Sequence, residues 1–462
     1  MRRLSALALA ACVLAGIPGV LARQAAQPAA IRRIAIFGSS VANGTGDESG
    51  REGYAGLLRA LLEPRGWEIV NRSRGGDNTK LLMSRFAPNG EAEPGTRFLL
   101  PVHPGYVLIA LSLGNEGIRA AEGTTAKDAL FDQFTRGIKA LIDRSRSEGI
   151  VPVVTLCYAR NDFTDVEYSY TRRANAAINQ WGVPSVNLLG AVDDGTGKWV
   201  NGFWWDSLHP NAAGHAELAA TFVPSLFDAL ERGKPLPRRP EGVRFARLAG
   251  GALTFAPDAP MHPFAFGMTV RTTGDGTIAR VTGTTLVPTT STKTVTRAGQ
   301  LPVTIASTIL TKSDPAAVAF GIRRGVWTYT STRGESISSS VPADARWHQL
   351  LVSHYTARGE SLFFVDGVLA GRAREQFAPT GFVVGGPAPT RRMDVRDVLI
   401  YRSALNADEA ATLWKGGLLQ ASLEVYSPLA DRQFVKGGPV ENRAQSLSEL
   451  KLEAGAALPG VR

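Results

Sequence analysis

The chain has 462 residues, more than one hydrophobic core usually organises, so its length favours two or three domains. Hydrophobic residues make up 44% of the sequence and charged residues 20%, which excludes a largely disordered chain. The formal net charge is +10, but the basic residues are scattered and form no nucleic-acid-binding motif, so we expect no nucleic acid partner.

The N-terminal residues 1–22 are typical of a secretory signal peptide. Arg2 and Arg3 precede an apolar run that ends in small residues near Ala22, and no second segment of this kind follows. We therefore expect a secreted or periplasmic protein with no stable membrane span after processing. The residues around Cys12 also resemble a lipoprotein box, so lipidation of Cys12 is the second interpretation.

Residues 31–233 alternate short apolar runs with helical periods. The runs occupy residues 31–37, 67–73, 106–113, 150–156 and 184–189, and the helical periods include residues 54–66, 129–149 and 211–233. Such alternation predicts a parallel sheet with helices on both faces, which is a three-layer α/β/α domain. Cys157, at the end of the fourth run, is predicted to be a buried residue without a disulfide partner.

A different pattern follows at residues 234–242, a charged and Pro-rich segment that is typical of a linker. Residues 243–419 alternate polar and apolar side chains with many Thr and Ser, which predicts an antiparallel β-sandwich. Asp366 and Gly367 suit the tight turn of a hairpin within it. We treat residues 420–462 as a C-terminal tail.

Two serines, Ser39 and Ser40, follow the first apolar run. Residues just beyond the carboxyl end of a parallel strand lie where α/β proteins bind ligands, so a serine there is placed for nucleophilic attack. By themselves, small polar residues between a strand and a helix are ordinary turn residues. A second sequence element that could activate the serine is therefore needed to support the catalytic interpretation.

Asp206 and His209 provide that element. A carboxylate three residues before a histidine holds the imidazole in one tautomer and stabilises the imidazolium that forms when the ring takes a serine proton. Serine needs such a base because its hydroxyl is a weak nucleophile at neutral pH. The alternative interpretation is that Asp206 caps a helix beginning near Pro210 and that His209 is a surface residue.

Gly76 and Asn115 follow the second and third apolar runs. Acyl transfer develops negative charge on the former carbonyl oxygen, and a glycine N–H and an asparagine amide are suitable donors to it. Each residue alone is weak support, since both residue types are common in turns.

These four blocks, in this order and at these strand ends, resemble those of the SGNH (GDSL-like) hydrolase superfamily. The resemblance covers the first predicted domain and implies a flavodoxin-like fold and an esterase that needs no cofactor. It implies Ser40 as nucleophile, His209 as general base and Asp206 as the residue that orients the base. The backbone N–H groups of Ser40 and Gly76 and the side chain of Asn115 would form the oxyanion hole.

Two of the blocks depart from the family pattern. The aspartate that precedes the family's nucleophile is absent, so Ser39 is a rival to Ser40, and the register favours Ser40 because Gly44 follows it at the family's spacing. In the asparagine block Leu113 takes the place of a glycine and Glu116 that of an aspartate. These changes indicate a divergent subfamily.

Four further residues are candidates for substrate binding. Trp204 and Trp205 either stack on a sugar ring or pack under the active-site loop. Asp77 and Asn78 either bind substrate hydroxyls or are solvated loop residues. We expect His215 to be a helix-surface or structural residue and not a metal ligand, because no cluster of metal-ligating residues accompanies it.

The second predicted domain resembles the concanavalin-like, laminin-G-type jelly roll. The resemblance is carried by residues 347–352, by the hairpin at Asp366 and Gly367, and by residues 393–414. That family binds glycans, sometimes with calcium, or acts as a spacer. The sequence picks out no calcium site, and calcium in the sandwich stays an open alternative.

The leading hypothesis is a secreted serine esterase that removes an acyl group, an acetyl, from a polysaccharide or oligosaccharide. The same residues suit a lipid ester or a thioester, and the altered blocks suit a noncatalytic carbohydrate-binding surface protein. A chain-length series of esters separates the first two, and the reactivity of Ser40 separates both from the third.

Overall fold

The computed structural model describes most of the chain, and Ile31–Arg462 forms one compact unit. The described ranges are 32–89, 95–242, 244–296, 302–386, 392–429, 438–453 and 457–460. The predicted signal peptide at residues 1–22, with Cys12, lies outside them. Within these ranges no helix is both long and apolar enough to cross a membrane.

Five parallel strands form the sheet of the α/β part, residues 32–233, in the order β2-β1-β3-β4-β5. They are β1 (Arg33–Gly38), β2 (Glu68–Asn71), β3 (Tyr106–Ala110), β4 (Val151–Thr155) and β5 (Ser185–Val186). All five predicted runs become strands, since strands buried on both faces need nearly continuous apolar sequence. The strand order is that of flavodoxin-like folds, with the switch point between β1 and β3.

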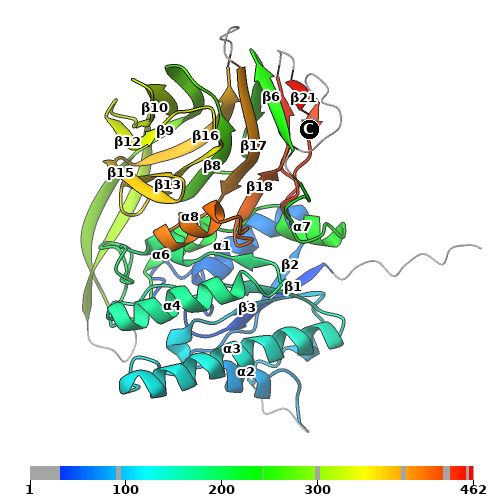
Figure 1. Ribbon diagram of the computed structural model, residues 1–462. Helices are drawn as coiled ribbons and strands as arrows, with labels where there is room; N and C mark the ends of the chain where they lie inside the picture. Colours follow the sequence, from blue (N-terminus) through cyan, green and yellow to red (C-terminus); the bar gives the residue numbers. More distant parts are fainter. Residues whose placement is uncertain are drawn as a thin grey trace, which may run out of the picture. The chain divides into compact units, whose positions relative to one another are not determined.

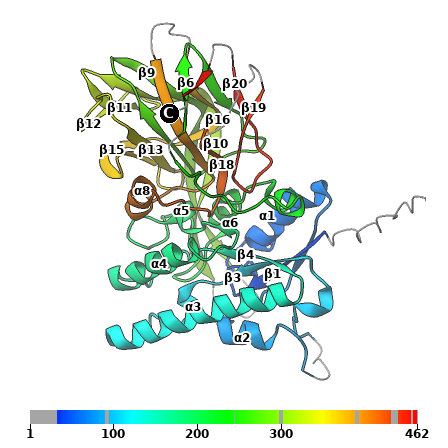
Figure 2. The same ribbon diagram turned by 45° about the vertical axis from the view of Figure 1, so that its right-hand side comes forward.

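Helices cover both faces of this sheet, which confirms the predicted three layers. They are α1 (Gly53–Leu62), α2 (Thr79–Ser84), α3 (Gly123–Ser147), α4 (Asp165–Ile178), α5 (Leu189–Val192), α6 (Ala212–Ala220) and α7 (Leu226–Glu231), with short 3-10 helices η1 (Glu63–Arg65), η2 (Leu100–Val102) and η3 (Leu113–Glu116). Ile34 and Ile36 of β1 pack with α1 and α6, whereas Ala35 and Phe37 pack with α2, α3 and α4. Figures 1 and 2 draw α2 and α3 below the strands and α1 above them.

The single helix predicted over residues 211–233 is in fact two helices, α6 and α7. Pro224 lies between them, and proline removes a backbone donor and disfavours helical geometry in the residue before it. Asn211 caps α6 by accepting a hydrogen bond from the N–H of Gly214 at 2.9 Å. Pro210 therefore precedes the cap and does not begin the helix.

Two antiparallel sheets form the predicted sandwich, residues 244–460, one in the order β12-β11-β10-β9-β16-β7-β20-β19 and the other in the order β15-β14-β13-β8-β17-β6-β21, with β18 beside β17. The ring centroids of Phe266 and Phe320, one from each sheet, lie 5.4 Å apart in the core between them. The elements are β6 (Phe245–Ala249), β7 (Ala252–Phe255), β8 (Phe264–Arg271), β9 (Gly276–Val295), β10 (Val303–Arg323), β11 (Val326–Thr330), β12 (Ser336–Pro342), β13 (His348–Tyr355), β14 (Glu360–Val365), β15 (Val368–Arg374), β16 (Phe377–Gly385), β17 (Arg392–Tyr401), α8 (Ala407–Trp414), β18 (Leu423–Ser427), β19 (Pro439–Val440), β20 (Leu450–Leu452) and β21 (Ala457–Gly460).

The β14–β15 hairpin turns at Asp366 and Gly367, as predicted. Their φ angles are 52° and 74°, and Val365 pairs with Val368 across the turn. The residues beyond 419, expected as a tail, instead contribute β18, β19, β20 and β21 to the two sheets.

The sandwich also contacts the α/β part. Ala357 packs in the α/β core, and Gly190 permits a close approach, because a Cβ there would lie 2.1 Å from the carbonyl oxygen of Ala404. From the long β9–β10 ribbon, the N–H of Thr308 donates to the carbonyl oxygen of Gly202 at 2.9 Å. The sandwich therefore braces the segment between α5 and α6.

Candidate active site

Ser40 lies just beyond the carboxyl end of β1, in the segment that leads to α1. Its Oγ lies 2.9 Å from Nε2 of His209. Ser39 is 1% exposed, and its buried Oγ has no hydrogen-bond partner in the part of the chain that the structure describes. Gly38 allows the close packing of this turn, because a Cβ there would lie 2.1 Å from the carbonyl oxygen of Ala110. The structure therefore brings Ser40, and not Ser39, to the histidine.

Asp206 and His209 lie in a tight segment, residues 204–210, which we call the acid–base loop. Both carboxylate oxygens of Asp206 lie 2.9 Å from Nδ1 of His209. Oδ1 also accepts hydrogen bonds from the backbone N–H of Leu208 at 2.7 Å and of His209 at 2.9 Å. Asp206 thus shapes the loop and orients the ring. Asn211 caps the following helix, so the alternative in which Asp206 is the cap is wrong.

The electrostatics of the loop fix the direction of these hydrogen bonds. Burial raises the pKa of Asp206, but the hydrogen bond and charge of His209 and the backbone donors outweigh burial and hold the pKa below its usual value. An ionised carboxylate only accepts hydrogen bonds, so Nδ1 of His209 carries the ring proton. In the neutral imidazole, Nε2 is then the acceptor that faces the hydroxyl of Ser40.

His215 ties α6 to the segment that follows Ser40. Its ring is fully buried, Nδ1 accepts a hydrogen bond from the N–H of Tyr54 at 3.2 Å, and Nε2 donates to the carbonyl oxygen of Thr45 at 3.0 Å. Burial lowers the pKa of His215 to about 4, so the ring is neutral and structural. Over the described ranges, no group of three His, Cys, Asp or Glu side chains is arranged to hold a metal ion.

Glu48, like His215, holds the segment after Ser40 in place, and the sequence did not predict this role. Its side chain is 1% exposed and accepts hydrogen bonds from the N–H of Ala212 at 2.7 Å and the hydroxyl of Ser307 at 3.4 Å. Nζ of Lys293 lies 3.2 Å from the same carboxylate. Glu48 therefore joins the segment after Ser40, the start of α6 and the β9–β10 ribbon.

The glycine block lies beside Ser40. The N–H of Arg74 donates to the carbonyl oxygen of Gly38 at 3.1 Å, and a Cβ on Gly75 would lie 3.7 Å from Cβ of Ser40. Gly76 follows with a φ of +85°, a conformation that favours glycine. The backbone of this loop is therefore next to the serine, as the sequence predicts.

The asparagine block lies on η3, directly after β3. Oδ1 of Asn115 accepts a hydrogen bond from the N–H of Ser112 at 2.9 Å, which leaves the amide N–H groups as the donors of this side chain. Glu116 is 7% exposed and accepts hydrogen bonds from the N–H of Thr79 at 2.8 Å and Nε2 of Gln133 at 2.5 Å. The glutamate at position 116, where the family pattern has an aspartate, therefore has a structural role, because its carboxylate stabilises the start of α2.

The other departure, Leu113, is fully buried in the core. Its N–H donates to Sγ of Cys157 at 3.3 Å. Cys157 is buried, as predicted, and burial raises the pKa of its thiol to about 12. A thiol in this state is not nucleophilic at neutral pH.

Two of the substrate-binding candidates have structural partners. Asp77 is 1% exposed, and its carboxylate accepts hydrogen bonds from Arg74 and Arg85, each at 2.8 Å. Asn78 caps α2 by accepting a hydrogen bond from the N–H of Leu81 at 3.0 Å. Both side chains thus hold the glycine block in shape.

The two tryptophans differ from each other. Trp205 belongs to the acid–base loop, its side chain is buried with 7% exposure, and its backbone N–H donates to the carbonyl oxygen of His209 at 2.9 Å. Trp204 is half-buried and lines an open cleft together with Asn161. The structure therefore leaves Trp204 available to a ligand in that cleft.

The sequence also did not predict a role for Arg160 and Asn161, which lie in the loop after β4. A guanidinium nitrogen of Arg160 donates to the carbonyl oxygen of Gly114 at 3.0 Å. The backbone N–H of Asn161 donates to the carbonyl oxygen of Ser207 at 2.8 Å. The loop therefore joins the asparagine block to the acid–base loop. No local pattern marks these residues, because their partners are distant in the sequence.

Residues 36–217 match the GDSL-like Lipase/Acylhydrolase family. The matched segment contains Ser40, Asp206 and His209 in their hydrogen-bonded arrangement. This part of the chain is a GDSL-like acylhydrolase domain, and the chain is an ester-bond hydrolase. The sandwich lies outside the match, and its concanavalin-like identity stays a prediction. No curated protein matches the chain.

Solved structures resemble the chain over part of its length. A GDSL-like lipase from Bacteroides thetaiotaomicron VPI-5482 is 14% identical, with 44% of this chain and 89% of the lipase covered and a TM-score of 0.32. An acetylxylan esterase from Geobacillus stearothermophilus is 16% identical, with 40% of this chain and 90% of the esterase covered and a TM-score of 0.30.

Proposed function

We propose that the chain removes an acetyl group from a carbohydrate ester through an acyl-enzyme on Ser40. The observation that carries the proposal is the relay in which Oγ of Ser40 lies 2.9 Å from Nε2 of His209, and Nδ1 lies 2.9 Å from Asp206. A hydroxyl becomes an effective nucleophile when such a base takes its proton.

In the first half-reaction, Oγ of Ser40 attacks the ester carbonyl carbon while its proton passes to Nε2 of His209. Asp206 stabilises the imidazolium that results. The negative charge on the former carbonyl oxygen is stabilised by the N–H groups of Ser40 and Gly76 and by the amide of Asn115. His209 then protonates the leaving sugar oxygen, and the alcohol departs.

In the second half-reaction, His209 takes a proton from water, and the hydroxide attacks the acyl carbonyl carbon. The bond to Oγ of Ser40 breaks, acetate leaves, and the serine regains its proton from the imidazolium. The proposal uses no cofactor.

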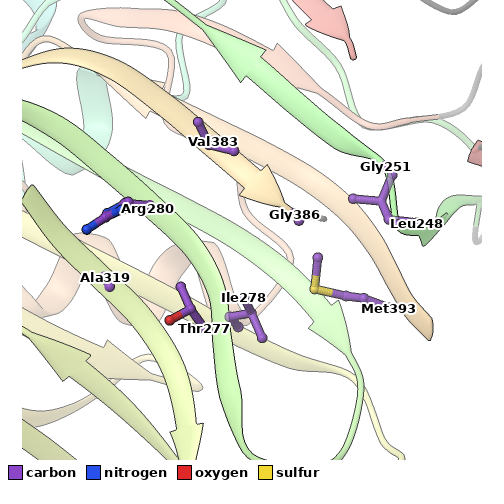
Figure 3. Close-up of a pocket in the computed structure, with 11 residues that line it drawn as sticks. Leu248, Gly251, Thr277, Ile278, Arg280, Ala319, Val383, Gly386 and Met393 are labelled. Carbon is purple, nitrogen blue, oxygen red and sulfur yellow. The ribbon is translucent and has the colours of Figure 1, made fainter. Parts of the chain in front are cut away.

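One feature supports a sugar ester over a lipid ester. Trp204 lines an open cleft of about 720 Å³ beside the acid–base loop, and an indole face suits a sugar ring. A separate pocket of about 510 Å³ takes all its lining residues from the sandwich, among them Leu248, Ile278 and Met393 (Figure 3), and so lies outside the α/β part that carries Ser40.

The test compares the wild-type protein with Ser40→Ala, and with Ser39→Ala as the matched control. We expect wild type and Ser39→Ala to hydrolyse nitrophenyl acetate and to release acetate from acetylated oligosaccharides, and Ser40→Ala to do neither. A preference for acyl chains beyond about eight carbons would favour the lipid ester. Failure to hydrolyse any ester, with glycan binding intact, would favour the noncatalytic binding protein.

A further inference from the structure

The open cleft beside the acid–base loop takes residues from both parts of the chain. Its floor includes Asn161, Lys198 and Trp204 of the α/β part, and its wall includes Arg358 and Arg374 of the sandwich. We call it the junction cleft. Any ligand that fills it touches both parts.

The floor of the junction cleft continues into the acid–base loop. The N–H of Asn161 donates to the carbonyl oxygen of Ser207 at 2.8 Å, and Ser207 follows Asp206 in the sequence. Trp204 pairs with Pro210 in a short antiparallel bridge that closes the loop. The junction cleft and the acid–base loop therefore share Trp204, so a polymer bound in the cleft lies next to the loop that carries His209.

The wall of the junction cleft is held in place. Ala357 packs in the core of the α/β part, and the guanidinium of Arg358 lies over the ring of Tyr355, 4.2 Å from its centroid. A Cβ on Gly195, which follows Asp194 of the lining, would lie 3.2 Å from a guanidinium nitrogen of Arg358. Because these contacts need no ligand, the junction cleft is preformed, which lowers the entropic cost of binding.

The junction cleft has an excess of positive charge. Its lining has four cationic side chains (Lys198, Arg358, Arg372 and Arg374) and two anionic ones (Asp194 and Glu360). Glu360 is already paired with Arg358, and Asp194 accepts hydrogen bonds from backbone N–H groups of its own turn at 2.8 and 3.1 Å. Within the described ranges, Lys198 and Arg374 form no ion pair.

We propose that the junction cleft binds the saccharide chain next to the esterified sugar and favours chains that carry carboxylates. This inference rests on the proposed function. Guanidinium groups bind carboxylates through paired hydrogen bonds, and an ammonium group attracts them as a point charge. Trp204 adds an aromatic face for a sugar ring. An acylated chain of uronic acids therefore matches both the positive charge and the aromatic surface of the junction cleft.

The experiment compares an acetylated oligogalacturonide with the same oligosaccharide after reduction of its carboxyl groups. Acetate release gives kcat/KM for each, and the ratio of the acidic to the reduced form does not depend on the amount of folded enzyme. We expect a ratio above one for wild type and a ratio roughly three- to tenfold lower for Lys198→Gln/Arg374→Gln. The control Arg346→Gln changes a side chain that is 78% exposed and outside the junction cleft, and should keep the wild-type ratio.

Salt provides a second readout, because about 0.5 M NaCl screens partly exposed charges and should move the wild-type ratio toward one. A wild-type ratio of one or less, or the same ratio in wild type and the double variant, would overturn this inference and leave the esterase intact. Failure of the proposed function looks different, because neither oligosaccharide would release acetate, or Ser40→Ala would release it from both.

Discussion

His215 should make the stability of the protein depend on pH in a way that one substitution removes. Its ring is fully buried, and burial lowers its pKa from the ordinary 6.5 to about 4. The variant His215→Gln keeps a side-chain N–H for the carbonyl oxygen of Thr45, which Nε2 now contacts at 3.0 Å, and it has no titratable group.

The magnitude follows from the difference between the two pKa values of His215, 6.5 minus about 4. A difference of about 2.5 corresponds to about 3 kcal/mol. Between these pH values the unfolded chain holds the proton and the folded chain does not. The free energy of unfolding that this histidine contributes is therefore fully present above pH 6.5 and is lost as the pH falls to about 4.

The assay is urea denaturation of wild type and His215→Gln at several pH values between 7 and 4. We expect the free energy of unfolding of wild type to fall by about 3 kcal/mol more than that of the variant. Burial lowers the pKa of His354 to about 3, but both proteins carry His354 and its contribution cancels. Parallel pH profiles, or a wild type that gains stability relative to the variant at low pH, would refute the reasoning.

Three further substitutions test the site. Asp206→Asn keeps an acceptor for the loop but turns an amide N–H toward Nδ1 of His209. We therefore expect kcat on a short ester to fall by roughly 10³–10⁴. A fall of less than tenfold would contradict the orienting role of Asp206. Asn115→Ala removes the proposed oxyanion donor and should lower kcat by roughly 10²–10³ with little change in KM, whereas a change in KM alone would contradict this role. Glu116→Ala deprives the N–H of Thr79 of its buried acceptor, so urea denaturation should show a loss of about 1–3 kcal/mol, and no loss would contradict the capping role.

The serine, glycine and asparagine blocks could be predicted to lie together because each of them follows the carboxyl end of a parallel strand. Neighbouring strands β1 and β3 place these ends side by side, so Ser40 and Asn115 could be expected at one edge of the sheet. The choice of Ser40 over Ser39 depended on register, and the structure agrees with it because Ser39 points into the interior.

Contacts between segments far apart in the sequence could not be predicted. The carboxylate of Glu48 pairs with Lys293 of the ribbon, and that of Glu116 holds Thr79, yet no local pattern marks any of these residues. Strands β19 and β20 have two and three residues, too few for an alternating pattern, and they exist through pairing with each other and with β7. The junction cleft likewise depends on segments that meet only in the folded chain.

The central claim is that Ser40 is the nucleophile, and covalent labelling tests it most directly. A fluorophosphonate reacts with a serine that a neighbouring base has activated, and peptide mass mapping identifies the modified residue. The account predicts one adduct, on Ser40, that persists in Ser39→Ala and disappears in Ser40→Ala. An adduct on Ser39, or an unlabelled Ser40 in a folded protein that hydrolyses esters, would contradict it.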